Sequence, residues 1–211
     1  MRKLLGHGLF VLANFYSCMH TTIDIWINPP KSTDVTDESL TTLYEIKSKL
    51  FAEEMSLLTT LRMQNNFTIY EPPIGGKFPK ITYDEIIAEI QNIVIGMALM
   101  SQATKTLEAA VVSSSEQESW LDKLAEVIEA TDFHSHTVTS LLCHLSAAVS
   151  NGSALPPYLT IPKSFPLARR LHEIDGGLLS VKHASESAFC AFASLEVLSS
   201  LVNQSLTKLV K

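Results

Sequence analysis

Proline and glycine are distributed very unevenly along this chain of 211 residues, and that distribution constrains the fold more than any other feature. They concentrate at Pro29-Pro30, between residues 72 and 79, between residues 152 and 166, and at Gly176-Gly177. The long stretches between these points contain few of either residue. Because proline and glycine both disfavour helix interiors, this punctuation predicts long helices separated by stiff or turn-rich connections.

The apolar residues within these stretches recur at steps of three and four, which is the spacing of one helical face. The first stretch carries this stripe at Leu5, Leu9, Leu12, Phe15, Tyr16, Met19, Ile23 and Trp26. The second carries it at Leu40, Leu43, Leu50, Phe51, Leu58 and Leu61, and the last at Val181, Ala188, Phe192, Leu195, Val202, Leu206 and Leu209. No stretch shows the sustained alternation that is typical of strands.

Local signals predict where some helices begin. Thr82 and Glu85 have the spacing of a capping box, and Ile81 and Ile86 stand at the positions of a hydrophobic staple. The serines at 113–115, followed by two glutamates, predict a turn and a fresh helix start. Pro166 is compatible with the first turn of a short helix.

These signals together predict an all-α fold that forms a single domain over residues 1–211. The expected helices cover residues 2–27, 36–64, 83–112, 116–150, 165–173 and 178–210. Five of them are long, and one is short. Helices of this length, joined by short or proline-stiffened loops, pack most easily as an antiparallel bundle, and two proline-rich loops are its landmarks.

Composition indicates which partners and which cellular compartment to expect. Charged residues make up 18% of the chain, the formal charge is −6, and no basic stripe with interleaved aromatics is present, so nucleic acid is not expected as a partner. Three widely separated cysteines argue against a disulfide framework and suit a reducing compartment. The apolar runs Leu4–Met19 and Ile86–Met100 are both interrupted by polar residues, so we expect no transmembrane segment in the chain itself.

The sequence offers no constellation that favours catalysis. Asp132, His134, His136 and His144 do not converge on a helix, and their spacing matches no tetrahedral zinc pattern. The adjacent Cys143 diverges from His144 by about 100° and so does not form a nucleophile–base pair. Neither a Gly-x-Ser-x-Gly elbow nor the spacing of a phosphate-binding loop is present. We therefore expect no catalytic, cofactor-binding or metal-binding residues and no enzyme, with a metal-dependent enzyme as a remote alternative.

The two proline-rich loops carry the residues that we single out as structural or interaction positions. The first loop contributes Glu71, Pro72, Pro73, Phe78 and Pro79, and the second contributes Pro156, Pro157 and Tyr158. Arg169, Arg170 and His183 follow the second loop. The favoured interpretation is that the loops pack their apolar residues onto the bundle, and the alternative is that they form a docking surface.

At these loops the sequence resembles a known family. The segment Glu71-Pro-Pro-Ile-Gly-Gly-Lys-Phe-Pro-Lys80, with the helix that follows, is similar to an element of fungal transporters of the brefeldin A-sensitivity type. These are relatives of the fusaric acid resistance and aromatic acid exporter proteins. Leu155-Pro-Pro-Tyr-Leu-Thr-Ile-Pro162, Ala168-Arg-Arg-Leu171 and Ser180-Val-Lys-His183 resemble the closing part of the same domain.

The resemblance implies a cytosolic domain that follows a bundle of membrane helices. We therefore expect a non-catalytic domain of an efflux transporter, on the cytoplasmic side of the endoplasmic reticulum or plasma membrane, which supports assembly or regulation. Its expected partner is the transmembrane part of a parent transporter or another membrane protein, and homo-oligomerisation stays open. The alternative is a stand-alone helical module that binds partner helices in an apolar groove.

Overall fold

The computed structural model describes residues 1–27, 33–70, 78–113, 136–157, 159, 161, 165–174, 176–184 and 186–210. Its α-helices are α1 (Arg2–Ile27), α2 (Thr33–Phe67), α3 (Lys80–Ser113), α5 (His136–Asn151), α6 (Pro166–Ile174) and α7 (Ser187–Val210). Short 3₁₀ turns are η1 (Thr68–Tyr70), η2 (Gly176–Leu179) and η3 (Val181–His183). The described residues contain helices and turns and no strand, so the predicted all-α class is confirmed.

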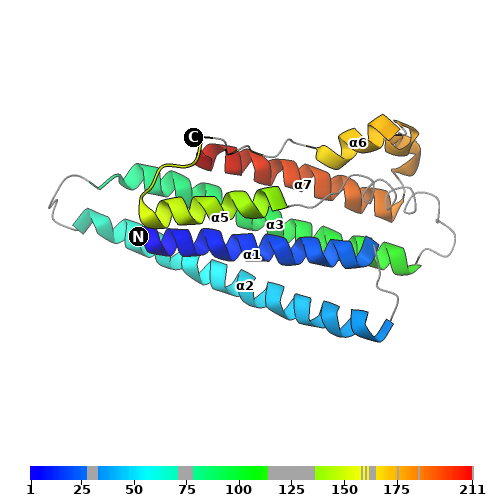
Figure 1. Cartoon of the computed structure of the whole chain (residues 1–211), viewed down its shortest axis with the longest axis horizontal. Coiled ribbons are helices and arrows are strands. Elements are labelled where there is room, and N and C mark those ends of the chain that lie inside the picture. The colour runs from blue at the N-terminus through cyan, green and yellow to red at the C-terminus, as the bar shows by residue number, and fades with distance from the viewer. Residues whose placement is uncertain are drawn as a thin grey trace.

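The long helices run side by side as an antiparallel bundle, and α6 lies over one part of α7 (Figure 1). Contacts between helices fix the directions. Asn65 near the end of α2 donates a hydrogen bond to Asp84 near the start of α3 at 2.5 Å. Lys208 near the end of α7 pairs with Glu89 in the first half of α3 at 2.7 Å. Both contacts join the end of one helix to the early part of its neighbour, as antiparallel packing requires.

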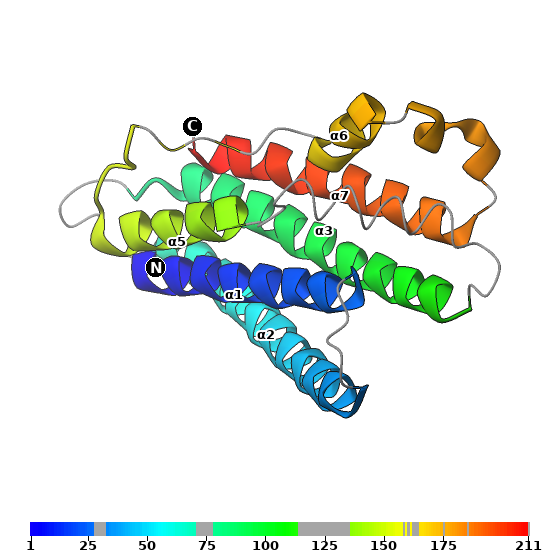
Figure 2. The same cartoon turned by 45° about the vertical axis from the view of Figure 1, so that its right-hand side comes forward.

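The buried core follows the stripes that the sequence predicts. α1, α3, α5 and α7 meet in one cluster whose most deeply buried side chains include Leu5, Met19, Ile90, Ile93, Met97, Leu141, Leu142 and Leu206. α2 contributes Leu58 and Leu61. The prediction was wrong for one stripe residue, since Phe51 is 37% exposed. Its helix, α2, diverges from the bundle toward its N-terminal end (Figure 2). Trp26 has no described side chain.

The start of α3 differs from the prediction. The helix begins at Lys80, and the Tyr83 amide donates to the carbonyl oxygen of Pro79 at 3.2 Å. Thr82 therefore lies inside the first turn, so the predicted capping box was wrong. Proline at 79 suits this boundary because it follows the restricted residue Phe78 and interrupts the preceding chain.

The last predicted helix is shorter than expected. Residues 176–183 form η2 and η3, and α7 begins only at Ser187. Gly176-Gly177 thus starts a pair of tight turns and does not border the helix directly. The short helix agrees with the prediction to within one residue, with Pro166 at its first position. Of the predicted helix 116–150, the part before residue 136 lies outside the described residues.

Helices α1 and α5 approach each other closely at Gly6. The Ser146 hydroxyl donates to the Gly6 carbonyl oxygen at 2.6 Å. A Cβ atom added at Gly6 would lie 1.9 Å from the Ser150 hydroxyl oxygen and 2.8 Å from the Ser146 carbonyl oxygen. The second of these atoms belongs to the backbone, so the two helices would have to separate.

We therefore expect Gly6→Ala to lower the free energy of unfolding by about 1 to 3 kcal/mol, because overpacking outweighs the higher helix propensity of alanine. Urea titration followed by circular dichroism measures this change. Lys3→Ala, at an exposed position of the same helix, is the control and should change stability little. An unchanged or raised stability of Gly6→Ala would show that α1 and α5 do not meet at this point.

Two of the described helices are long and apolar enough to cross a membrane by length and composition alone. They are α3, over Lys80–Ala109, and α7, with mean hydropathies of 1.4 and 1.2. Both also place a face in the bundle core, and buried core helices satisfy the same criterion. The sequence-based expectation that the chain has no transmembrane segment therefore stays a prediction.

Candidate functional site

The residues predicted from the first proline-rich loop do not gather into a site. Glu71, Pro72 and Pro73 lie outside the described residues. Phe78 is half-buried and its ring stacks on Tyr83, with ring centroids 4.8 Å apart. Pro79 is exposed and ends the loop where α3 begins. Of the two predicted residues of this loop that the structure describes, Phe78 packs on α3 and Pro79 does not.

The second proline-rich loop behaves in the same way. Leu155, Leu159 and Ile161 are partly buried and pack against the core, which confirms packing as the role of these three residues. Pro156 is half-buried, and its carbonyl oxygen accepts a hydrogen bond from the Leu159 amide at 3.2 Å. Pro157 is exposed. Tyr158 lies outside the described residues.

The predicted residues after the second loop hold the local structure around α6 and η3. Arg169 is exposed on α6, which also contains Arg170, whose side chain is not described. The Ala168 amide of α6 donates to the buried Glu196 carboxylate of α7 at 3.2 Å. His183 Nδ1 lies 2.8 Å from Glu186 Oε1, which fixes the turn into α7. These positions lie away from the start of α3 (Figure 1), so the predicted residues do not form one site.

The histidine cluster considered for a metal site falls largely outside the structure's described ranges. Asp132 and His134 are not described, and neither is the side chain of His136. His144 is exposed on α5. Across the described ranges no three His, Cys, Asp or Glu side chains group as metal ligands. Burial raises the pKa of the Cys143 thiol, which disfavours the thiolate that a nucleophile needs.

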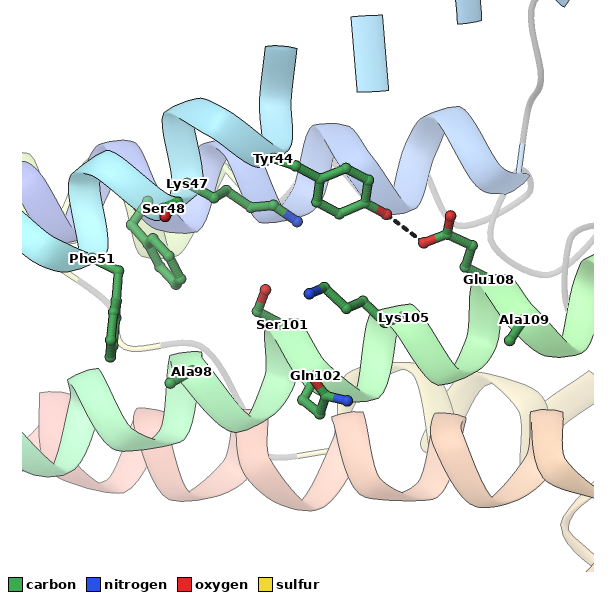
Figure 3. Close-up of a pocket in the computed structure, with 11 residues that line it drawn as sticks. Tyr44, Lys47, Ser48, Phe51, Ala98, Ser101, Gln102, Lys105, Glu108 and Ala109 are labelled. Atoms are coloured by element: carbon green, nitrogen blue, oxygen red, sulfur yellow. Dashed lines mark hydrogen bonds between the residues drawn. The ribbon is translucent and has the colours of Figure 1, made fainter. Parts of the chain in front are cut away.

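A groove lies between α2 and α3. Its volume is about 850 Å³, which is in the range of small-molecule sites. The groove exists because α2 diverges from α1 and α3 toward its N-terminal end (Figure 2). Residues of α2 from Tyr44 to Phe51 face residues of α3 from Ala98 to Ala109 across it (Figure 3).

Lys47 is the most unusual residue of this groove. Its side chain points into the groove toward Lys105 of the opposite helix (Figure 3), yet Lys47 is only 3% exposed. No described group accepts a hydrogen bond from its ammonium nitrogen. Burial, and secondly the charge of Lys105, lower the pKa of Lys47 below its ordinary value. A buried ammonium without an acceptor is costly, so its retention needs a reason.

The aromatic ring of Tyr44 partly compensates the two ammonium groups. Lys47 Nζ lies 4.4 Å and Lys105 Nζ 5.8 Å from the centre of this ring, within the range of cation–π attraction. The Tyr44 hydroxyl donates a hydrogen bond to the Glu108 carboxylate. Two ammonium groups against one carboxylate leave one uncompensated positive charge among the described groups that line the groove.

The other end of the groove is apolar. Phe15, Phe51 and Ala98 line it, and the Phe15 and Phe51 rings lie with centroids 6.3 Å apart. A separate small void of about 10 Å³ on the core side of these rings is lined by Leu12, Leu50, Glu54, Val94 and Met97. The two ammonium groups and Glu108 therefore lie toward one end of the groove, and the two phenylalanine rings lie at the other (Figure 3).

Glu54 is buried beside this void and is 1% exposed. Neither carboxyl oxygen has a hydrogen-bond partner among the described residues. Burial, and secondly the charge of Glu53, raise the pKa of Glu54 from 4.5 to about 8. This carboxyl group is therefore largely protonated at neutral pH, which explains how the core accommodates it.

The apolar stripes indicated Phe15 and Phe51 as core residues, but no sequence pattern considered above indicated Lys47 or Lys105. A signal was present, because Leu40, Lys47, Glu54 and Leu61 follow one another at intervals of seven residues on the inward face of α2. Lys47 and Glu54 are not apolar, so the apolar stripe by itself did not include them. Charged residues at the inward positions of an otherwise apolar heptad pattern are the feature that could have located this site.

A family model described as the brefeldin A-sensitivity protein 4-like domain matches residues 1–206. No curated protein and no solved structure matches the chain significantly.

Proposed function

This chain belongs to the family of brefeldin A-sensitivity protein 4-like domains, and we propose that it is a non-catalytic domain that supports the assembly or regulation of a membrane transporter. We propose that the parent transporter is related to the fusaric acid resistance and aromatic acid exporter proteins, which the sequence resembles. In this proposal the domain lies on the cytoplasmic side of a membrane, against the transmembrane part of its parent protein. The observation that carries the proposal is an exposed apolar surface on α3 and α7.

This surface, the α3–α7 stripe, consists of Ile95, Leu99, Val197 and Leu201, each about half exposed. Gly96 of α3 lies directly against Val202 of α7, since a Cβ atom at Gly96 would be 2.7 Å from a Val202 methyl group. When two antiparallel helices touch at one residue each, the residue one position earlier in each helix faces the same side of the pair. Ile95 and Leu201 therefore share one side, and Leu99 and Val197 extend it by one turn.

An apolar stripe of this kind suits a partner that is itself apolar. Large apolar side chains at the centre of an exposed helix pair are characteristic of interaction surfaces. Each of α3 and α7 contains an 18-residue window that is apolar enough to cross a membrane by composition. This composition supports the transmembrane part of a transporter as the occupant, and the family relation supports the same partner.

The first test is fractionation of cells that express the native gene product. We expect the product to sediment with membranes and to resist extraction by high salt, because burial of apolar surface is insensitive to charge screening. Recovery of the native product in the soluble fraction would contradict the proposal. It would instead favour the stand-alone interaction module.

A second experiment tests whether the α3–α7 stripe is the interface with the membrane partner. Leu99→Gln combined with Leu201→Gln should leave the helical content unchanged and should reduce the amount of assembled transporter recovered in mild detergent. Met63→Gln combined with Ile69→Gln is the matched control, since both residues are exposed and lie outside the stripe. Equal recovery of the two double variants would show that the α3–α7 stripe is not the interface.

A further inference from the structure

The groove between α2 and α3 combines features that no support role requires. A domain that only packs against a membrane partner through α3 and α7 gains nothing from a buried, unpartnered ammonium group on α2. Lys47 points into a groove of about 850 Å³ and has no described acceptor, as expected of a group whose acceptor belongs to a ligand. Lys105 faces the same space from α3 (Figure 3).

We infer that this groove binds a single-chain amphiphile with one anionic head group, of the kind represented by a linear alkyl carboxylate. The inference stands independently of the transporter role. The head would lie between the Lys47 and Lys105 ammonium groups, and the chain would extend along Phe15, Phe51 and Ala98.

The charge of the groove favours a monoanion. Lys47 and Lys105 contribute two positive charges, and Glu108 contributes one negative charge that Tyr44 holds by its hydroxyl. One negative charge on the ligand therefore neutralises the described groups, whereas a dianion would leave an excess. Ser101 adds a hydroxyl group near the Lys105 ammonium group (Figure 3). Charge-assisted hydrogen bonds from ammonium to carboxylate are stronger than neutral ones.

The shape and the lining of the groove favour a linear chain. The α3 side extends from Ala98 to Ala109, which corresponds to about 16 Å of helix. At its apolar end the groove is bounded by Phe15, Phe51 and Ala98. An elongated groove with an apolar end fits an alkyl chain that lies along the groove between α2 and α3.

The probe for this inference is decanoate at concentrations where it is monomeric, titrated into the full chain by calorimetry. We expect saturable binding by the wild-type chain. Octanoate should bind several-fold more weakly, since each buried methylene adds to the affinity. Decylammonium, with the same chain and the opposite charge, should not bind. Equal binding of decanoate and decylammonium would overturn the inference, as would no binding of decanoate.

Variants locate the head group. Lys47→Met keeps the aliphatic stem and removes the charge, and it should raise the dissociation constant of decanoate about tenfold. Lys49→Met, at an exposed position on the same helix, is the matched control and should leave that constant unchanged. If Lys47→Met does not fold, Lys105→Met tests the same head site from α3, and it should also weaken binding. Unchanged affinity in the Lys47 or the Lys105 variant would overturn the inference.

Discussion

Replacement of Glu54 by glutamine is expected to remove a large pH-dependent loss of stability from this protein. The folded-state pKa of Glu54 is about 8, whereas its ordinary value is 4.5. Between these values the folded protein keeps a proton that the unfolded chain releases, so the free energy of unfolding falls as pH rises. Below pH 4.5 the effect is absent, and above about pH 8 it is complete. The accumulated loss is about 3 to 5 kcal/mol.

The measurement is chemical denaturation of the wild-type chain and of Glu54→Gln from pH 4.5 to 8.5. The variant should match the wild type at the acid end and become progressively more stable toward the alkaline end, because glutamine has no proton to lose. Glu45→Gln, at an exposed position of α2, is the control and should follow the wild-type curve. Parallel curves for the wild type and Glu54→Gln would mean that Glu54 titrates in the folded protein as it does in the unfolded chain.

Replacement of Lys47 by methionine is expected to raise the free energy of unfolding by about 1 to 3 kcal/mol at neutral pH. Methionine retains most of the apolar stem and removes an ammonium group that has no described acceptor. The pKa of Lys47 lies below its ordinary value of 10.5, so the folded protein loses this proton before the unfolded chain does. The free energy of unfolding of the wild type therefore rises with pH between the folded-state pKa of Lys47 and 10.5. The stability advantage of the methionine variant should shrink over this pH range.

Urea titration of the two chains at neutral and at alkaline pH tests this expectation. Lys49→Met is the control, because Lys49 is exposed on the same helix and its replacement should change stability by less than about 0.5 kcal/mol. The charges of Cys18, Lys105 and Glu108 also act on Lys47, so their own protonation states contribute to the alkaline result. Destabilisation by Lys47→Met would show that the ammonium group already has an adequate partner in the ligand-free protein.

These two results would give the groove a physical interpretation. Residues that lower stability in the free protein and that line a concave surface are characteristic of functional sites, because their partners arrive with the ligand. Lys47 fits this description directly. Glu54 lines the small void behind the apolar end and not the groove itself. A stable Lys47→Met variant that no longer binds decanoate would connect the loss of stability to the ligand.

Much of the fold could be predicted from the sequence because local signals are sufficient to specify a helix. The predicted first helix, 2–27, agrees with α1 at both ends. The predicted 36–64 and 83–112 fall inside α2 and α3 by up to three residues at each end. The start of α3 was missed because the Pro79 carbonyl begins the hydrogen-bonded turn and Thr82 does not. The start of α7 was missed because the glycine pair leads into 3₁₀ turns.

The candidate site could not be predicted in the same way. Lys47 and Lys105 are 58 residues apart in the chain, and no local pattern links them. Their meeting depends on the antiparallel pairing of α2 with α3 and on the divergence of α2 from the bundle (Figure 2). The same divergence exposes Phe51, which the apolar stripe assigned to the core.

The sequence by itself determined that this protein is a set of long helices with defined apolar faces, because helical periodicity and the punctuation by proline and glycine act over a few residues. It also carried the family relation through the order of its loop motifs. Only the tertiary structure decided which charged side chains are buried, which apolar ones remain exposed, and where a groove opens. Those properties depend on the distance between neighbouring helices, and that distance follows from packing across the whole bundle.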